Sequence, residues 1–436
     1  MVSALPPGGA RAVARCDMLG AAPYSDMAGG LYRAYLTPAY AAAQRALTEW
    51  MEQAGMTVRL DPAANLIGRY EGATRDAPAL LIGSHIDSVR DAGLYDGPLG
   101  VMLGIEAVDA LNRAGRRLPF PIEIIAFGDE EGSRFPAAML TSRAVAGVLE
   151  ADALEVADRD GVTLHDALAS FRHPSEGWGL MPRNAKTPAF AGVTDYLAAR
   201  RAPGATLAYL EAHIEQGPVL EAKGLALGTV TGIAAQLRLS AIVTGQANHA
   251  GTTTMALRRD ALTGAAEMML AIEGIARDDA SDLVATVGRI EALPGAPNVV
   301  PGEVRFSIDI RSGDPARRDR AAQAILVALE HVASSRGLAV AVEQVHDLPA
   351  SPCDPALMDM MDAALADAGH PPFRLVSGAG HDAMAMAALC PTAMLFIRCR
   401  AGISHNPAEH IDPADAEAAF QAMLGFIRKL GESVAA

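Results

Sequence analysis

The stretch LIGSHIDSVRDAGLYDGPLG, residues 81–100, carries the first candidate chemistry of the chain. An apolar run ends there, and His85 and Asp87 follow at once, as polar groups do at the carboxyl end of a parallel strand. His85 and Asp87 point to the same side of an extended segment, so one can bind a metal while the other holds its surroundings. Asp96 follows in a turn-prone Tyr-Asp-Gly step. We interpret His85 and Asp96 as metal ligands; the alternative is a strand-end histidine and an ordinary turn carboxylate.

Three more candidate ligands occur later in the chain. Glu131 follows a second buried run in GDEEG, His213 lies in YLEAHIEQG, and His405 lies in SHNPAEH. Imidazoles and carboxylates suit Zn²⁺ or Mn²⁺ and do not suit Cu(I) or iron–sulfur clusters. A carboxylate shared by two metals roughly 3.5–4 Å apart would position and acidify a bridging water. Each histidine taken singly is also typical of a structural imidazole, and the ordered set is what favours a metal site.

The adjacent pair Glu130-Glu131 suggests a division of roles. Neighbours on a short turn cannot both ligate easily, so one can bind metal while the other takes a proton as general base. The alternative for the pair is a solvated acidic turn.

Alternating strand and helix patterns must position these groups. The chain of 436 residues is long enough for two or three domains. Its βαβ rhythm predicts an α/β fold, with a mostly parallel sheet that carries helices on both faces. Residues 231–343 instead read βαββαβ, which predicts an inserted α+β, ferredoxin-like domain with one helix-covered face and one polar face. The catalytic domain is then discontinuous, over residues 1–230 and 344–436.

Within the inserted domain, the alternation of apolar and polar residues predicts individual elements. Helices are expected at 259–275 and 315–335, and strands at 236–244, 283–293, 304–311 and 338–345.

Two segments depart from this rhythm. The first thirty residues are rich in Gly, Pro and Ala, and we expect them to be loosely ordered. Residues 172–194 contain three prolines and three glycines without a regular period, which predicts an irregular inserted loop.

Composition narrows the partners and the location. The chain has 36 Lys and Arg against 51 Asp and Glu, a formal charge of −15, which argues against nucleic acid and anionic membranes. Its four cysteines are scattered without a CxxC motif, which indicates reduced thiols and predicts a cytoplasmic protein. We see no apolar run of membrane-spanning length and no apolar segment typical of a signal peptide.

Taken together, seven motifs resemble the hydantoinase/carbamoylase family. They are GSHIDSV…YDGPLGV, DEEGSRF, LEAHIEQGPVLE, GQANHAGTTTM, PNVVPGEVRFSIDIRS, SGAGHDAMAM and SHNPAEH, and they follow the family order over about residues 35–430. Its members are N-carbamoyl-L-amino-acid hydrolases and allantoate amidohydrolases, within a wider group of dinuclear metallopeptidases that includes aminoacylases and carboxypeptidases.

The resemblance implies two divalent metal ions per subunit, Zn²⁺ or Mn²⁺, and a role for each candidate. One ion would be held by His85, Asp96 and His213. The other would be held by Asp96, Glu131 and His405, with Asp96 shared. Glu130 would be the general base and later the acid, and Asp87 would support His85 from behind.

The resemblance also implies substrate contacts and a dimer. The residues that match substrate-holding positions are Gln216, His249, Asn298, Arg311 and Gly380. Arg311 would grip a substrate carboxylate bidentately, and His249 would polarise the scissile carbonyl as a catalytic group. The small domain would carry dimerisation in a homodimer, with His249 and Asn298 entering the partner's site.

The implied reaction is hydrolysis of a ureido carbon–nitrogen bond by metal-activated water and a glutamate base, with release of ammonia and CO₂. Two alternatives remain: an aminoacylase or dipeptidase with the same metal site, and a non-catalytic binding protein on this scaffold. A histidine at position 213, where many peptidase relatives carry a carboxylate, favours the ureido branch. Allantoate, N-carbamoyl amino acids and 3-ureidopropionate all carry a carboxylate and a ureido group, and the sequence does not choose among these small molecules.

Overall fold

The computed structural model describes residues 5–172 and 196–435, so the irregular loop predicted at 172–194 lies outside the described residues apart from its first position. The described residues form two compact units. The first comprises those within Met1–Thr231, Cys353–Leu375 and Gly380–Ala436, and the second comprises Gly232–Pro352 and Val376–Ala379. In the described part of the chain, no helix is both long enough and apolar enough to cross a bilayer.

The first unit is built on a sheet with the strand order β1-β2-β4-β3-β5-β16-β6, and β15 also pairs with β6. The central neighbours β4, β3, β5 and β16 run parallel, whereas β1, β2 and β6 pair antiparallel at the flanks. The bounds are β1 (Thr57–Leu60), β2 (Leu66–Tyr70), β3 (Ala79–His85), β4 (Ile122–Phe127), β5 (Thr206–Ile214), β6 (Leu227–Ile233), β15 (Arg374–Ser377) and β16 (Thr392–Ile397).

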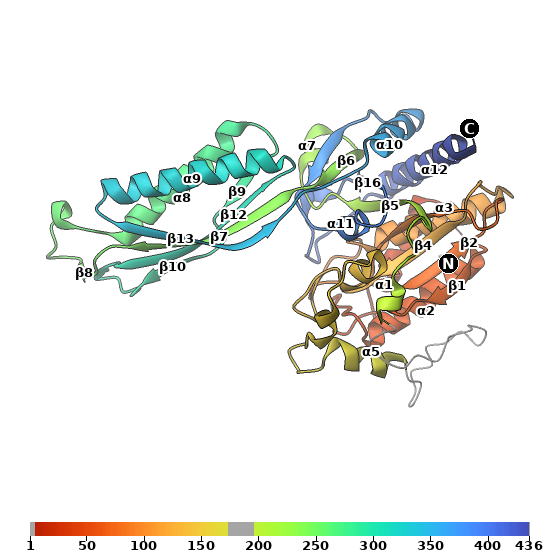
Figure 1. Cartoon of the computed structure of the whole chain (residues 1–436), viewed down its shortest axis with the longest axis horizontal. Helices are drawn as coiled ribbons and strands as arrows, with labels where there is room; N and C mark the ends of the chain where they lie inside the picture. Colours follow the sequence, from red (N-terminus) through yellow and green to blue (C-terminus); the bar gives the residue numbers. More distant parts are fainter. Residues whose placement is uncertain (1–4, 173–195, 436) are drawn as a thin grey trace. The chain divides into compact units, whose positions relative to one another are not determined.

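Helices surround this sheet (Figure 1). Their bounds are α1 (Gly9–Leu19), α2 (Pro38–Gln53), α3 (Pro98–Arg113), α4 (Leu140–Ala146), α5 (Leu164–Arg172), α7 (Val219–Lys223), α10 (Pro355–Asp367), α11 (Asp382–Met386) and α12 (Pro413–Ala435), with 3₁₀ turns η2 (Ala151–Glu155), η3 (Leu197–Ala199) and η5 (Arg400–Gly402). Every residue of β3, β4 and β16 is buried, as a sheet covered on both faces requires. The predicted α/β class with a largely parallel central sheet is confirmed.

The expectation that the first thirty residues are loosely ordered is wrong for residues 9–19, which are helical. Residues Gly9–Leu19 form α1, which packs against α3 and α12. Arg11 and Arg15 of this helix reach the buried carboxylate of Glu106 on α3, at 2.5 Å and 2.6 Å. Local composition gives no sign of such pairing, because the partner lies about ninety residues away.

The second unit is an antiparallel sheet with the order β10-β12-β7-β13, and β9 also pairs with β12. Helices α8 and α9 pack on one face of it (Figure 1). The bounds are β7 (Ala235–Thr244), β8 (Asn248–His249), η4 (Met255–Leu257), α8 (Ala261–Asp279), β9 (Val284–Thr286), β10 (Ile290–Leu293), β11 (Val299–Val300), β12 (Glu303–Ser312), α9 (Pro315–Ser335), β13 (Ala339–Leu348) and β14 (Ser351–Pro352).

The βαββαβ prediction is confirmed, with one difference. The single strand expected at 283–293 is interrupted at residues 287–289, which are not in a strand. The structure therefore has two short strands here, β9 and β10. There Arg289 exchanges hydrogen bonds with Ser307, accepting from its backbone N–H and donating to its hydroxyl. Along β12, even-numbered residues such as Phe306 are buried in the core and odd-numbered ones line the polar face.

Candidate metal centre

The strand order of the first unit collects the predicted ligands. Strand β3 ends at His85 and lies between β4 and β5, and His213 lies near the end of β5. Glu131 follows β4, and His405 follows β16, which pairs in parallel with β5. Because these strands run parallel, their carboxyl ends share one edge of the sheet.

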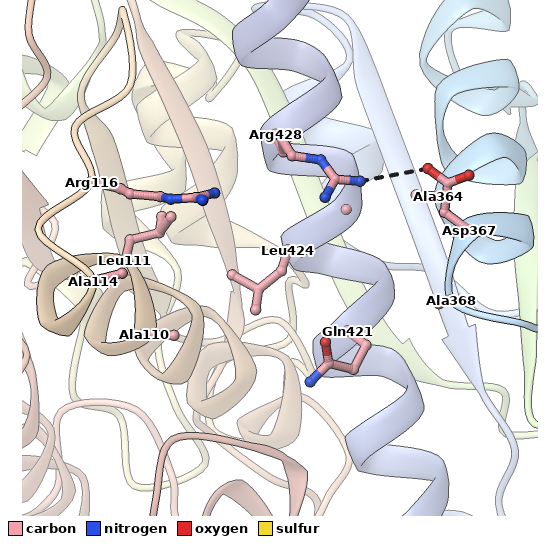
Figure 2. A pocket seen from close by; sticks show the side chains of 11 residues that line it. Ala110, Leu111, Ala114, Arg116, Ala364, Asp367, Ala368, Gln421, Leu424 and Arg428 are labelled. Atoms are coloured by element: carbon pink, nitrogen blue, oxygen red, sulfur yellow. Dashed lines mark ion pairs between the residues drawn. The ribbon is translucent and has the colours of Figure 1, made fainter.

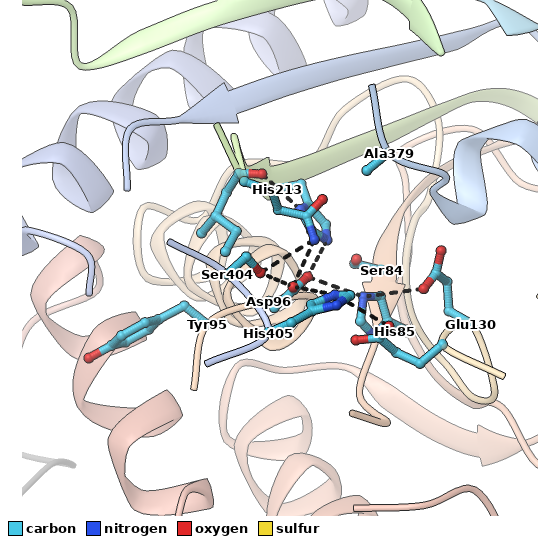
Figure 3. A network of polar contacts seen from close by, with 12 residues as sticks. Ser84, His85, Tyr95, Asp96, Glu130, His213, Ala379, Ser404 and His405 are labelled. Carbon is cyan, nitrogen blue, oxygen red and sulfur yellow. Dashed lines mark hydrogen bonds and ion pairs between the residues drawn. The ribbon is translucent and has the colours of Figure 1, made fainter. Parts of the chain in front are cut away.

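Asp96 lies between three imidazoles (Figure 3). Its Oδ1 is 3.7 Å from Nε2 of His85 and 3.2 Å from Nε2 of His213. Its Oδ2 is 3.2 Å from Nε2 of His405, which in turn is 3.4 Å from Oε2 of Glu131. The donor atoms therefore form two groups, each within 4.8 Å and joined by Asp96: His85, Asp96 and His213, and Asp96, Glu131 and His405.

The outer nitrogens of two rings fix their orientation. Nδ1 of His85 lies 3.1 Å from the carbonyl oxygen of Asp87, and Nδ1 of His213 lies 2.9 Å from that of Ile214. A carbonyl only accepts, so each Nδ1 carries a proton, and the Nε2 atom is the one that a cation can bind once it has lost its own proton. Nε2 of His213 is buried and has no hydrogen bond of acceptable geometry among the described residues, although Asp96 is close. A cation between the two would satisfy that atom.

The histidines and carboxylates of this cluster shift one another's pKa values. Burial lowers the pKa of His85 and His213, but the hydrogen bonds to Asp96 together with the negative charge of the neighbouring carboxylates raise both pKa values above the ordinary value. Contact with Asp96 raises the pKa of His405 to about 9. Burial alone would raise the pKa of Asp96, yet the three imidazoles hold it well below its usual range. Protons on the imidazoles thus balance charge that a bound cation would otherwise balance.

The two adjacent glutamates face different imidazoles. The backbone N–H groups of Glu130 and Glu131 donate to the two oxygens of Asp87, at 3.2 Å and 3.3 Å. Oε2 of Glu130 lies 3.9 Å from Nε2 of His85, whereas Glu131 faces His405. Burial raises the pKa of Glu131 to about 7 and the pKa of Glu130 well above its ordinary value. The buried carboxylate of Asp87 therefore fixes the backbone from which both glutamate side chains project.

Two residues missed by the sequence reasoning hold the Asp96 loop. The Ser404 hydroxyl donates a short hydrogen bond to Oδ2 of Asp96, and its oxygen also lies 3.1 Å from Oε2 of Glu409. Oε1 of Glu409 accepts from the backbone N–H of Tyr95 at 2.7 Å and of Asp96 at 3.3 Å. Ser404 and Glu409 belong to the same motif as His405, SHNPAEH, and this shared motif is the sequence signal that could have identified them.

A glycine is required on the other side of Asp96. Gly97 has φ of 83°, and a Cβ there would lie 2.5 Å from the ring of His85. A side chain at this position would therefore displace a candidate ligand.

A third group of possible ligands, Glu211, His213 and His381, was also not predicted. Both oxygens of Glu211 already accept hydrogen bonds, from the Ser84 hydroxyl at 2.7 Å and the Ala383 N–H at 2.9 Å. Glu211 thus ties the end of β3 to the start of α11. Its position two residues before His213 was the signal for it.

The predicted substrate residues divide between the units. In the first unit, Nε2 of Gln216 donates to Oδ2 of Asp96 at 2.8 Å, which places Gln216 among the candidate ligands. Gly380 also belongs to this unit.

The remaining substrate candidates belong to the second unit. His249 in β8 pairs with Val299 of β11, beside Asn298, whose carbonyl accepts from the Ala250 N–H at 2.9 Å. Arg311 lies on β12. The structure therefore brings His249 and Asn298 together.

A separate hollow in the first unit lies between α3, α10 and α12 (Figure 2). Its charged groups are Arg116, Asp367 and Arg428, the last two 3.5 Å apart. Its lining contains no histidine and none of the candidate ligands. It is not a candidate for hydrolysis.

Comparison with known proteins agrees with this fold and identifies the family. A family model described as Peptidase family M20/M25/M40 matches residues 81–429. An allantoate deiminase of Arabidopsis thaliana is 39% identical over an alignment of 445 positions, gaps included, which covers 95% of this chain and 81% of the relative. An N-carbamoyl-L-amino acid amidohydrolase of Geobacillus stearothermophilus is 40% identical over 381 residues, 87% and 88% of the two chains.

A solved structure extends the likeness to three dimensions. The crystal structure of a hydantoinase/carbamoylase family amidase from Burkholderia multivorans covers 97% of this chain and 98% of its own, with a TM-score of 0.86 and 34% identity. The chain belongs to peptidase family M20/M25/M40 and, within it, to the hydantoinase/carbamoylase amidases. It is an enzyme, a hydrolase that acts on non-peptide carbon–nitrogen bonds.

Proposed function

We propose that the protein is a metal-dependent amidohydrolase that cleaves the ureido carbon–nitrogen bond of allantoate or of an N-carbamoyl-L-amino acid. The observation that carries the proposal is the sharing of Asp96 by two groups of candidate ligands, with Glu130 beside one of them. Relatives named as allantoate deiminase and N-carbamoyl-L-amino acid amidohydrolase support the choice of substrate class.

In this proposal, His85, Asp96 and His213 hold one divalent cation, and Asp96, Glu131 and His405 hold the second. Nitrogen and oxygen donors of this kind fit Zn²⁺ or Mn²⁺, and the buried Nε2 of His213 fits an inward-facing ligand. When bound, the cations would polarise the ureido carbonyl and lower the pKa of a water.

Glu130 is the proton carrier. Its buried carboxyl takes a proton from the attacking water and returns it to the leaving nitrogen, so that the amine departs neutral and the carbamoyl group ends as ammonia and CO₂. The raised pKa of Glu130, caused by burial, suits a group that must both accept and release a proton. Asp87 keeps Glu130 in place by accepting a hydrogen bond from the backbone N–H of Glu130. Oδ1 of Asp87 also lies 3.7 Å from Nδ1 of His85.

The substrate is held through its two polar ends. Arg311 pairs with the carboxylate, and His249 donates to the ureido oxygen as charge builds on it. Gln216, Asn298 and Gly380 complete the contacts.

We further propose that the chain acts as a homodimer through its second unit. Met255 and Leu257, in the turn between β8 and α8, are 77% and 75% exposed, and large exposed apolar side chains beside one another fit a contact between copies. Sedimentation at micromolar concentration gives a dimer mass in this account, and a monomer mass contradicts it.

A substrate panel tests the function. The purified protein, loaded with Zn²⁺ or Mn²⁺ in turn, is assayed with allantoate, N-carbamoyl-alanine, 3-ureidopropionate, N-acetyl-alanine and a dipeptide. We expect ammonia release from at least one ureido acid and loss of that activity with a chelator. Turnover of the acylated amino acid or dipeptide without any ureido acid would instead identify an aminoacylase or dipeptidase.

A further inference from the structure

Strand β12 carries a carboxylate and a guanidinium bonded as one unit on its polar face. Asp309 and Arg311 are two residues apart, so their side chains share that face. Nε of Arg311 donates to Oδ1 of Asp309 at 2.7 Å, and Nη2 donates to Oδ2 at 3.1 Å. This two-pronged arrangement fixes the plane of the guanidinium as well as its position.

The carboxylate of Asp309 is itself held in place by hydrogen bonds from three side chains. Its Oδ2 also accepts from Nε2 of Gln236 and from Nε of Arg238, both at 2.8 Å and both on the neighbouring strand β7. With the two bonds from Arg311, Asp309 accepts four hydrogen bonds, one on Oδ1 and three on Oδ2. Partial burial would raise the pKa of Asp309, but the bonds from Arg311 and Arg238 lower it below its ordinary value, so the group stays charged at neutral pH.

Arg311 has some capacity left. Of the roughly five N–H donors of a guanidinium, two go to Asp309 and one on Nη1 goes to the carbonyl of Gly378. About two donors remain, one on each terminal nitrogen, which is the number that a carboxylate accepts in a paired geometry. The Arg311 side chain is 28% exposed, so these donors are accessible.

We propose that Asp309 is a positioning residue for substrate recognition, which holds the guanidinium of Arg311 so that its two remaining donors face the substrate carboxylate. The inference rests on the proposed function, in which Arg311 binds that carboxylate. A long side chain that is already fixed loses less conformational freedom when the substrate binds, so the pairing strengthens binding of the acid. The opposite effect, in which Asp309 competes with the substrate for Arg311, predicts tighter binding once Asp309 is neutralised.

The test compares Asp309→Asn with wild type on the ureido acid that wild type turns over and on its carboxamide, in which the carboxylate is replaced by an amide. For the acid, we expect KM to rise about tenfold, the equivalent of one lost charge-assisted hydrogen bond, with kcat within about twofold. For the carboxamide, we expect KM to change by less than about twofold. A merely structural role would not change the preference for the acid over the carboxamide.

The same strand offers a matched control. Glu303 and Arg305 form another carboxylate–guanidinium pair two residues apart on β12, with Nε of Arg305 2.7 Å from Oε1 of Glu303. Glu303→Gln removes this pair without touching Arg311, and we expect no change in either KM.

A double variant decides whether Asp309 acts through Arg311. In an Arg311→Gln background, the added Asp309→Asn change has no further effect on KM if the two residues act together. An unchanged or lowered KM for the acid in Asp309→Asn, an equal rise for the carboxamide, or a persistent effect in the Arg311→Gln background overturns the proposal. If Asp309→Asn does not fold, Asp309→Glu, which displaces the charge by one methylene, gives the same comparison, and an unchanged preference for the acid contradicts the inference.

The two proposals fail separately. If wild type hydrolyses no ureido acid, the proposed function fails and this inference fails with it. If wild type hydrolyses one and Arg311→Gln raises its KM while Asp309→Asn does not, only the role of Asp309 fails.

Discussion

Replacing Glu130 by glutamine separates proton transfer from metal binding. The amide has nearly the shape of the carboxyl group but cannot take a proton from water. The Glu130 side chain is 11% exposed, and its closest imidazole nitrogen, on His85, lies 3.9 Å away. The backbone N–H of residue 130 keeps its bond to Asp87, so the loop retains its path. We therefore expect the variant to fold and to keep its metal.

The size of the effect follows from the role. A positioned general base contributes about 10²–10⁴ in rate, or about 2.7–5.5 kcal/mol of barrier. We expect kcat to fall at least about 100-fold, with KM nearly unchanged, because Glu130 is not assigned to substrate binding.

The assay is steady-state release of ammonia from the preferred ureido acid, at equal metal content verified by elemental analysis. Glu131→Gln is the matched control, since Glu131 is the adjacent residue but belongs to the ligand group of His405. We expect that variant to lose bound metal. A Glu130→Gln enzyme that keeps its metal and retains kcat within about tenfold of wild type, or that loses metal as Glu131→Gln does, refutes the reasoning.

Two further predictions concern charge. Contact with Asp96 raises the pKa of His405 to about 9, so below about pH 9 a cation must displace a proton from this ring. We expect the metal affinity, measured by calorimetry, to rise with pH by up to about tenfold per pH unit for this proton below about pH 9, and this contribution to flatten above it. A flat profile below about pH 9 contradicts the assignment of His405 as a ligand. Glu106→Ala removes the carboxylate that pairs with the buried Arg11 and Arg15. We expect the free energy of unfolding, measured in urea, to fall by about 3–5 kcal/mol. Arg113→Ala, which removes the exposed partner of Asp109, is the control and changes stability by less than about 1 kcal/mol, and an equal loss in both variants contradicts the buried pairing.

Much of the fold could be predicted because its signals are local. The buried runs of β3 and β4 and the alternation along β12 are each visible within ten residues. The helix α1 was missed because the groups that it packs against and pairs with, α12 and Glu106 of α3, are remote in sequence. The composition of a segment predicts neither a buried ion pair with a distant residue nor the helix that this ion pair stabilises.

The candidate site shows the same division. His85 and Glu131 are marked by the strands that precede them, whereas the meeting of Asp96, His213 and His405 depends on a sheet order that no local pattern contains. The order of the motifs along the chain supplied that information through the family resemblance. Glu409 was missed because its task is to accept backbone N–H groups 313 and 314 residues away.

Metal stoichiometry is the most direct test of the shared carboxylate. Chelator-stripped protein is titrated with Zn²⁺ or Mn²⁺ by calorimetry, and bound metal is counted by elemental analysis for wild type and Asp96→Asn. Because Asp96 belongs to both ligand groups, we expect two ions per chain in wild type and weakened binding of both in the variant. One ion or none in wild type, or two tightly bound ions in Asp96→Asn, would contradict the account.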